Sequence, residues 1–137
     1  MTETVSLDFE LKSPIARVWN ALTDPAMLSQ WTFFDVDDFQ AVVGYRFHFR
    51  GKASTGWTQV IDCEVLEVDA PHRLAYTWAV WDHTTTVTWT LTEAEGGATR
   101  LHLEQSGFDS ERRQEIGGAK YGWTAQVGQL QNLLAAQ

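Results

Sequence analysis

Apolar and polar residues alternate along much of this chain. Residues 5–11 place an apolar side chain at every second position, which is the period of a strand with one buried face. The same alternation returns in residues 45–49, 57–65, 74–80, 87–91 and 101–103. Short turns rich in Gly, Pro and Asp separate these stretches, so the pattern predicts consecutive antiparallel strands. Thr, Arg, His and Glu occupy the other phase, so we expect only one face of the sheet to be covered.

Two short helices are predicted between the first strand and the others. Ser13 is expected to cap the first helix, with Pro14 at its first position. Apolar residues at helical spacing then run from Ile15 to Leu22. The pair Asp24-Pro25 repeats the start signal, which predicts a second helix that carries Trp31.

The C-terminal segment is predicted to form one long helix. Between Ser110 and Ala136, apolar residues recur every three or four positions and form one stripe. The stripe consists of Ile116, Ala119, Trp123, Val127, Leu130 and Leu134. Each glycine destabilises a helix by about 1 kcal/mol relative to alanine, so the Gly117-Gly118 pair predicts that the firm helix begins near Ala119.

Together these elements predict an α+β fold of the helix-grip type in a single domain, residues 1–137. We expect a curved antiparallel sheet of about six or seven strands, two short helices after the first strand, and the long C-terminal helix over the concave face. A helix is only about 10–12 Å wide, so either large side chains fill the hollow of the bent sheet or an apolar cavity remains. The residues expected to line such a cavity are Trp31, Trp57, Tyr76, Trp78, Trp89, Gln105, Phe108, Trp123 and Val127.

Charge and composition exclude several classes of partner. The formal net charge is -8, and such a surface repels nucleic acid and anionic membranes. The N-terminus lacks the basic and apolar regions of a signal peptide, and no stretch approaches the about 18 apolar residues of a spanning helix. We therefore expect a cytoplasmic protein with no nucleic-acid partner and no membrane insertion. The single cysteine, Cys63, excludes an intrachain disulfide and is expected to be a buried, unreactive thiol.

The sequence contains no recognisable catalytic or metal-binding pattern. Its four histidines form no closely spaced pair, and no Cys-x-x-Cys is present, so we predict neither a metal site nor a cofactor. A nucleophile elbow and a phosphate-cradling glycine loop are also missing. We therefore assign no catalytic residue.

Two features leave a functional and a structural interpretation open. Four charged residues on the polar phase of neighbouring strands form either an acid–base pair or solvated cross-strand pairs; they are Asp62, Glu64, Arg100 and Glu104. The hairpin tip Trp81-Asp82-His83 is either a pocket rim or partner contact, or an ordinary turn.

Several segments resemble a known family. The run from Pro14 to Pro25 with Trp31 resembles the first helices of the SRPBCC (START/Bet v 1-like) superfamily. Further agreement lies in residues 43–47, 65–78, 87–91, 97–101, 106–108 and 122–123. Within the superfamily, the sequence is most similar to the family related to the C-terminal domain of the activator of Hsp90 ATPase. The resemblance covers nearly the whole chain and implies the helix-grip fold, but this fold is shared by lipid carriers, polyketide cyclases and chaperone cofactors.

These observations lead to three functional hypotheses. The first is binding of a small apolar or amphipathic molecule in the cavity between sheet and helix. The second is an enzyme of the polyketide cyclase or hydrolase type that uses the same cavity, with Tyr76 and Gln105 as the inward polar residues to inspect. The third, implied by the resemblance, is a stress or chaperone-cofactor interaction protein. A homodimer through an edge strand or the hairpin tip is a further option.

Overall fold

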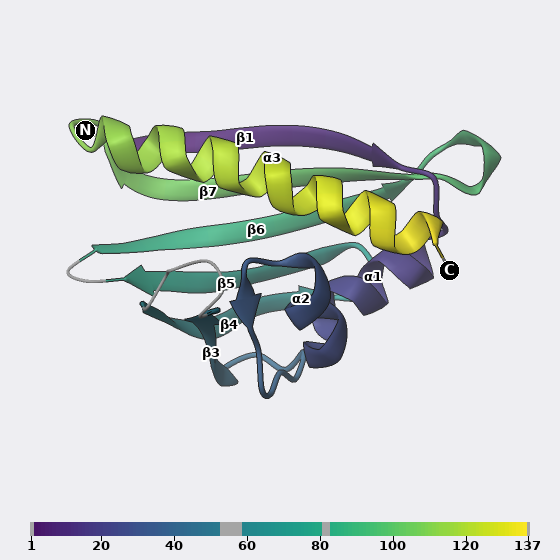
Figure 1. The fold of residues 1–137 in the computed structure, drawn as a ribbon, viewed down its shortest axis with the longest axis horizontal. Coiled ribbons are helices and arrows are strands. Elements are labelled where there is room, and N and C mark those ends of the chain that lie inside the picture. The colour runs from purple at the N-terminus through teal and green to yellow at the C-terminus, as the bar shows by residue number, and fades with distance from the viewer. Residues whose placement is uncertain (1, 53–58, 81–82, 137) are drawn as a thin grey trace.

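The computed structural model describes residues 2–52, 59–80 and 83–136 (Figure 1). Its elements are β1 (Thr2–Leu11), α1 (Ile15–Thr23), α2 (Pro25–Trp31), β2 (Phe34–Asp35), β3 (Arg46–Gly51), β4 (Val60–Asp69), β5 (Arg73–Val80), β6 (His83–Glu93), the 3-10 turn η2 (Glu95–Gly97), β7 (Thr99–Asp109) and α3 (Arg113–Ala135). In the described part of the chain the strands form one seven-stranded antiparallel sheet in the order β1-β7-β6-β5-β4-β3-β2. The predicted α+β helix-grip fold is confirmed.

The first and last strands lie side by side in this sheet. β1 pairs with β7 in antiparallel register, with Leu7 opposite Leu103, so the N-terminal strand closes the sheet beside the strand that leads into α3. The long helix crosses one face of the sheet, and α1 and α2 lie on the same side (Figure 1). α3 also contacts α1, α2 and β1.

The core beneath the short helices is filled by large rings. Trp31 is 1% exposed and its indole Nε1–H donates to the Ala21 carbonyl at 2.8 Å. The Trp31 and Trp89 rings meet edge to face, with centroids 6.1 Å apart. Trp89 Nε1–H in turn donates to the Tyr76 hydroxyl at 3.0 Å. With their polar atoms satisfied, these rings can be buried without the cost of an unpaired group.

The start of α1 differs from the prediction, whereas the start of α2 agrees with it. The residue before α1 is Pro14, which provides no side-chain cap, so the prediction of a Ser13 cap was wrong. Ser13 is instead buried, and its carbonyl accepts a hydrogen bond from the Thr99 hydroxyl at 2.7 Å. Asp24 does cap α2, because its carboxylate accepts from the Ala26 N–H at 2.9 Å.

The C-terminal helix begins earlier than the glycine pair predicted. α3 starts at Arg113, because a turn closed by the Arg112 N–H and the Asp109 carbonyl at 2.9 Å leads directly into it. An ion pair between Arg112 and Glu115, 3.1 Å apart, supports the first turn, and Ile116 is buried in a small cluster with Val5 and Phe108. Tertiary packing therefore outweighs the low helix propensity of glycine here.

No helix in the described residues has the length and the apolar character needed to cross a membrane.

Candidate functional site

A pocket of about 740 Å³ lies between the first half of α3 and the inner face of strands β4 to β7. The helix side of this pocket carries small residues, Gly118, Ala119 and Gly122. A methyl group added at Gly122 would meet only the Phe33 ring at 4.0 Å and the Gln126 amide at 3.9 Å. These small residues leave room beside the larger side chains that the same helix adds to the lining, which are Gln114, Glu115, Tyr121, Trp123 and Gln126.

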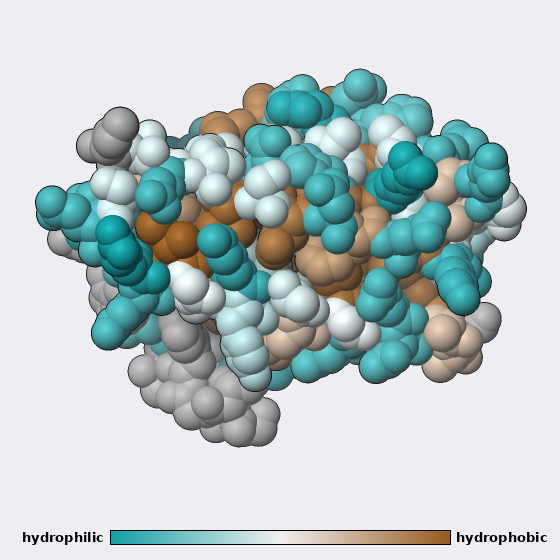
Figure 2. All heavy atoms as spheres, turned by 90° about the horizontal axis from the view of Figure 1, so that it is seen from above, coloured by the Kyte–Doolittle hydropathy of each residue, from teal (hydrophilic) through white to brown (hydrophobic). Residues whose placement is uncertain are grey.

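The pocket reaches the protein surface. Tyr121 belongs to its lining and is 73% exposed, which places this residue at the mouth. Figure 2, a view from above Figure 1, shows apolar side chains reaching the surface between polar ones. A small molecule therefore has a route to the lining without unfolding of α3.

Aromatic rings form the walls. Trp78 of β5 packs against Trp123 of α3 with ring centroids 5.2 Å apart, and Phe34 packs against Trp78 at 5.7 Å. Phe108 of β7 lines the far part of the pocket. Edge-to-face contacts of this kind hold the rings in place, so the walls are pre-formed.

One buried amide ties the helix to the sheet across the pocket. The Gln105 side chain is 3% exposed and its Oε1 accepts from the Trp123 indole N–H at 2.8 Å. Its Nε2 donates to the Thr85 hydroxyl, also at 2.8 Å. This arrangement fixes the Trp123 ring and satisfies the Gln105 carbonyl and the Thr85 hydroxyl.

The segment after α2 forms another wall through its backbone hydrogen bonds. The Phe33 N–H donates to Gln126 Oε1 of α3 at 2.9 Å, and the Phe34 N–H donates to the Thr32 hydroxyl at 3.3 Å. Gln126 is itself held by its Nε2, which donates to the Gly122 carbonyl at 3.1 Å. The two phenylalanines are thereby anchored to α3 and to the end of α2.

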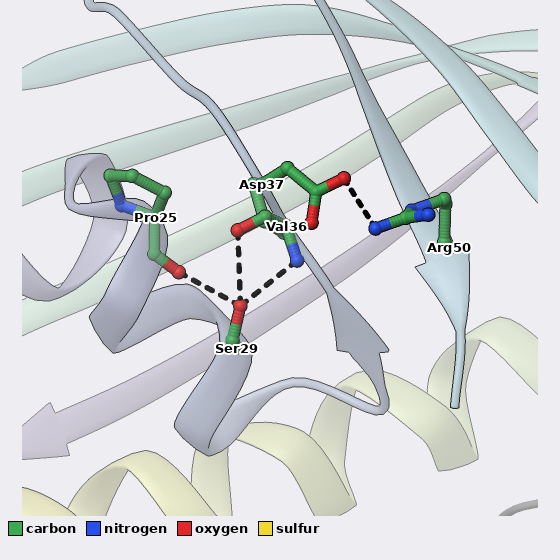
Figure 3. Close-up of polar contacts among 5 residues, drawn as sticks. All are labelled: Pro25, Ser29, Val36, Asp37 and Arg50. Atoms are coloured by element: carbon green, nitrogen blue, oxygen red, sulfur yellow. Dashed lines mark hydrogen bonds and ion pairs between the residues drawn. The ribbon is translucent and has the colours of Figure 1, made fainter. Parts of the chain in front are cut away.

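A serine in α2 anchors the same segment at Val36, two residues beyond Phe34 (Figure 3). The Ser29 hydroxyl donates to the Pro25 carbonyl at 2.9 Å and accepts from the Val36 N–H at 2.9 Å. Beyond it, the Asp37 carboxylate pairs with the Arg50 guanidinium of β3. These contacts connect α2 and β3 to the segment that follows β2.

The structure divides the predicted site residues into two groups. Four of them line the pocket: Trp78, Gln105, Phe108 and Trp123. Four lie in the filled core at 4% exposure or less and outside the pocket lining: Trp31, Tyr76, Trp89 and Val127. The remaining one, Trp57, lies outside the described residues, as do Trp81 and Asp82 of the predicted hairpin tip.

Several residues of the pocket lining were not predicted from the sequence. Phe33, Phe34 and Gln126 were not expected, although the helical spacing from Trp123 could have indicated that Gln126 faces inward. His83 and Thr85 lie on the same face of β6 as the buried Val87. The alternation of the strand could therefore have predicted that both face inward.

The buried titratable groups are not poised for acid–base chemistry. Burial raises the pKa of the Tyr76 hydroxyl above its ordinary value, and this hydroxyl is occupied by Trp89. Cys63 is buried as predicted, and burial, helped by the nearby Asp62 carboxylate, raises the pKa of its thiol. Both groups therefore stay protonated at neutral pH.

The charged residues of the strands form solvated pairs. Asp62 lies 2.7 Å from His48, and Glu64 lies 3.4 Å from Arg46; all four side chains are at least 41% exposed. Glu104 pairs with His102 at 3.0 Å. Exposed pairs of this type contribute little to stability, which supports the structural interpretation. Over residues 2–52, 59–80 and 83–136, no group of three or more His, Cys, Asp or Glu side chains is arranged to hold a metal ion.

Comparisons with known proteins place this chain in a family. A search of curated proteins found no match. Among solved structures, the chain is similar to protein MLL2253 from Mesorhizobium loti, with 36% identity, a TM-score of 0.89 and 98% of each chain covered. It is also similar to protein CV1439 from Chromobacterium violaceum, with 27% identity, a TM-score of 0.81 and 96% of each chain covered.

A further similar structure is that of DynU16, a protein in the dynemicin biosynthetic locus. The identity is 28% and the TM-score 0.78, with 96% of this chain and 47% of that chain covered. The family model described as activator of Hsp90 ATPase homolog 1-like protein matches residues 12–135. The chain therefore belongs to the activator of Hsp90 ATPase homolog 1-like family, within the SRPBCC superfamily.

Proposed function

We propose that this protein binds a small apolar or amphipathic molecule in the pocket between the sheet and α3. The observation that carries the proposal is a pocket of about 740 Å³ with walls formed by Phe34, Trp78, Phe108 and Trp123. Ligand sites typically have volumes of about 300–1,000 Å³, mostly apolar walls and a few polar groups. The pocket has each of these properties.

The polar lining favours binding over catalysis. Glu115 is the one carboxylate among the described lining residues, and it pairs with Arg112 at 3.1 Å. The Tyr76 hydroxyl, an inward polar group considered for catalysis, lies in the core rather than in the lining. The other ionisable residues of the described lining are His83 and Tyr121, whereas general acid–base chemistry needs two such groups directed at one point.

Similarity to DynU16 adds limited support for a small organic ligand. That protein belongs to the dynemicin biosynthetic locus. The walls here, built from aromatic rings, suit a molecule of mixed aromatic and aliphatic character.

The proposal is tested by titration of the ¹⁵N-labelled protein with naphthalene, 2-naphthol and decanol, followed by ¹H–¹⁵N NMR. We expect at least one of these compounds to shift the indole N–H signal of Trp123 in a saturable manner. The indole N–H of Trp31, donated to the Ala21 carbonyl in the filled core, is the internal control and should hardly move. If no compound shifts the Trp123 signal, or if Trp31 shifts as much, the pocket is not a ligand site.

A further inference from the structure

The hydrogen-bond partners of the polar groups in the pocket indicate which ligand it accepts. Thr85 and Gln105 bond to each other, and Gln105 also bonds to Trp123. Gln126 is bonded to the Phe33 N–H and the Gly122 carbonyl. These groups support the walls and have at most residual hydrogen-bonding capacity.

His83 differs from them. It lines the pocket at the start of β6, two residues before Thr85 on the same face of the strand. Its Nε2 is buried and has no hydrogen-bond partner among the residues that the structure describes. An unpartnered buried polar atom costs about 1–3 kcal/mol, so this nitrogen is the place in the lining where a ligand group gains most from a hydrogen bond.

The ring next to His83 favours an aromatic ligand at this end. The imidazole and the Phe108 ring lie with centroids 6.0 Å apart and are inclined by 36°. Because the Nε2 atom is itself buried, the imidazole must turn about its Cβ–Cγ bond before this nitrogen meets a ligand in the pocket that the residue lines. The rings of His83 and Phe108 then flank the polar end of the ligand.

Charge excludes an anionic ligand. The described lining holds Glu115 but no Lys or Arg, and the whole chain carries a formal net charge of -8. A carboxylate or phosphate would leave water without a compensating cation. A hydroxyl carries no charge and both donates and accepts, so it suits His83 whichever ring nitrogen holds the proton.

We propose that His83 binds the hydroxyl group of an uncharged aromatic alcohol, and that it is a specificity-determining residue of the pocket. This inference rests on the proposed function, because it requires that the pocket takes up a small molecule. The apolar body of the ligand lies against Trp78 and Trp123, while its hydroxyl meets His83 near Phe108.

The test compares three probes of one shape: naphthalene, 2-naphthol and 2-naphthoate. Dissociation constants are measured by NMR at the Trp123 indole N–H for the parent protein, His83→Leu and the control His48→Leu, which changes an exposed histidine of β3 outside this pocket. For the parent we expect 2-naphthol to bind about three- to tenfold more tightly than naphthalene, the range for one net hydrogen bond. 2-Naphthoate should bind most weakly.

In His83→Leu the preference for 2-naphthol should disappear while naphthalene still binds, and in His48→Leu the preference should persist. Should His83→Leu not fold, the imidazole signals of His83 in the parent protein decide: they should shift with 2-naphthol and not with naphthalene. Equal binding of the two probes to the parent, or an unchanged preference in His83→Leu, overturns the role of His83 but leaves the proposed function intact. Failure of all three probes to bind overturns the role of His83, and if decanol also fails to shift the Trp123 signal, the proposed function is overturned as well.

Discussion

Replacing Gly122 by leucine adds a side chain to the pocket from the helix side. At this position a Cβ would contact only Phe33 and Gln126, at 4.0 and 3.9 Å, so the backbone need not move. Gly117 provides the matched control. It lies in the same helix, has no atom within 4 Å of an added Cβ, is exposed and is not part of the pocket lining.

Both substitutions should stabilise the helix by about 0.5–1 kcal/mol, because leucine has the higher helix propensity. For a chain of this length, that corresponds to a rise in Tm of about 2–5 °C. At Gly122 the leucine also becomes partly buried, and full burial of this side chain is worth about 1.5–3 kcal/mol. Gly122→Leu should therefore be at least as stable as Gly117→Leu.

The two variants should differ in ligand binding. A leucine in the pocket should remove ligand contacts equal to the burial of about two methylene groups, worth about 1.6 kcal/mol. The affinity of Gly122→Leu for naphthalene should therefore fall at least about tenfold. Gly117→Leu should bind like the parent. The assay is NMR titration at Trp123, with Tm from circular dichroism. Equal affinity of both variants, with both folded, would refute the placement of the ligand beside α3.

Two further predictions concern the hydrogen bonds around the pocket and the outer face of the sheet. Gln105→Leu leaves the buried indole N–H of Trp123 without its acceptor, so the free energy of unfolding, measured in urea, should fall by about 1–3 kcal/mol. The double variant Gln105→Leu/Trp123→Phe should lose less stability than the two single variants lose in sum. A hydrogen bond to Glu104, and to a smaller extent one to Asp8, raises the pKa of His102. Protonated His102 should therefore stabilise the fold fully below pH 6.5, and this stabilisation should be lost as the pH rises through the raised pKa of the folded state. In His102→Gln, the free energy of unfolding, measured in urea between pH 5.5 and about 8, should lose this pH dependence. A pH profile equal to that of the parent would contradict the role given to His102.

The sequence pattern predicts which face of each strand is buried, but not where the interior is filled. Trp78 and Trp89 both occupy inward positions of neighbouring strands, yet Trp78 lines the pocket and Trp89 is 1% exposed in the core. Trp123 of α3 packs on both rings, with centroids 5.4 Å from Trp89 and 5.2 Å from Trp78. Trp31 of α2 also packs on Trp89, whereas Phe34 packs on Trp78. Whether a ring lines the pocket or fills the core depends on these distant contacts, and strand periodicity carries no such information.

The helix starts show the same limit. Serine is a typical helix cap, yet Ser13 is buried and its carbonyl accepts a hydrogen bond from the Thr99 hydroxyl. Thr99 lies 86 residues further along the chain. The beginning of α3 likewise depends on burial of Ile116 against Val5 and Phe108. Local propensity describes the chain before such distant contacts form.

The central claim is that an open apolar space lies between Trp78, Trp123 and the Gly122 flank of α3. A crystal of the protein held under xenon gas tests it directly, because xenon occupies apolar cavities without needing a specific chemical group. We expect xenon density between the Trp78 and Trp123 rings and the Phe108 wall. Side chains collapsed into this space, with no xenon bound there, would contradict the account.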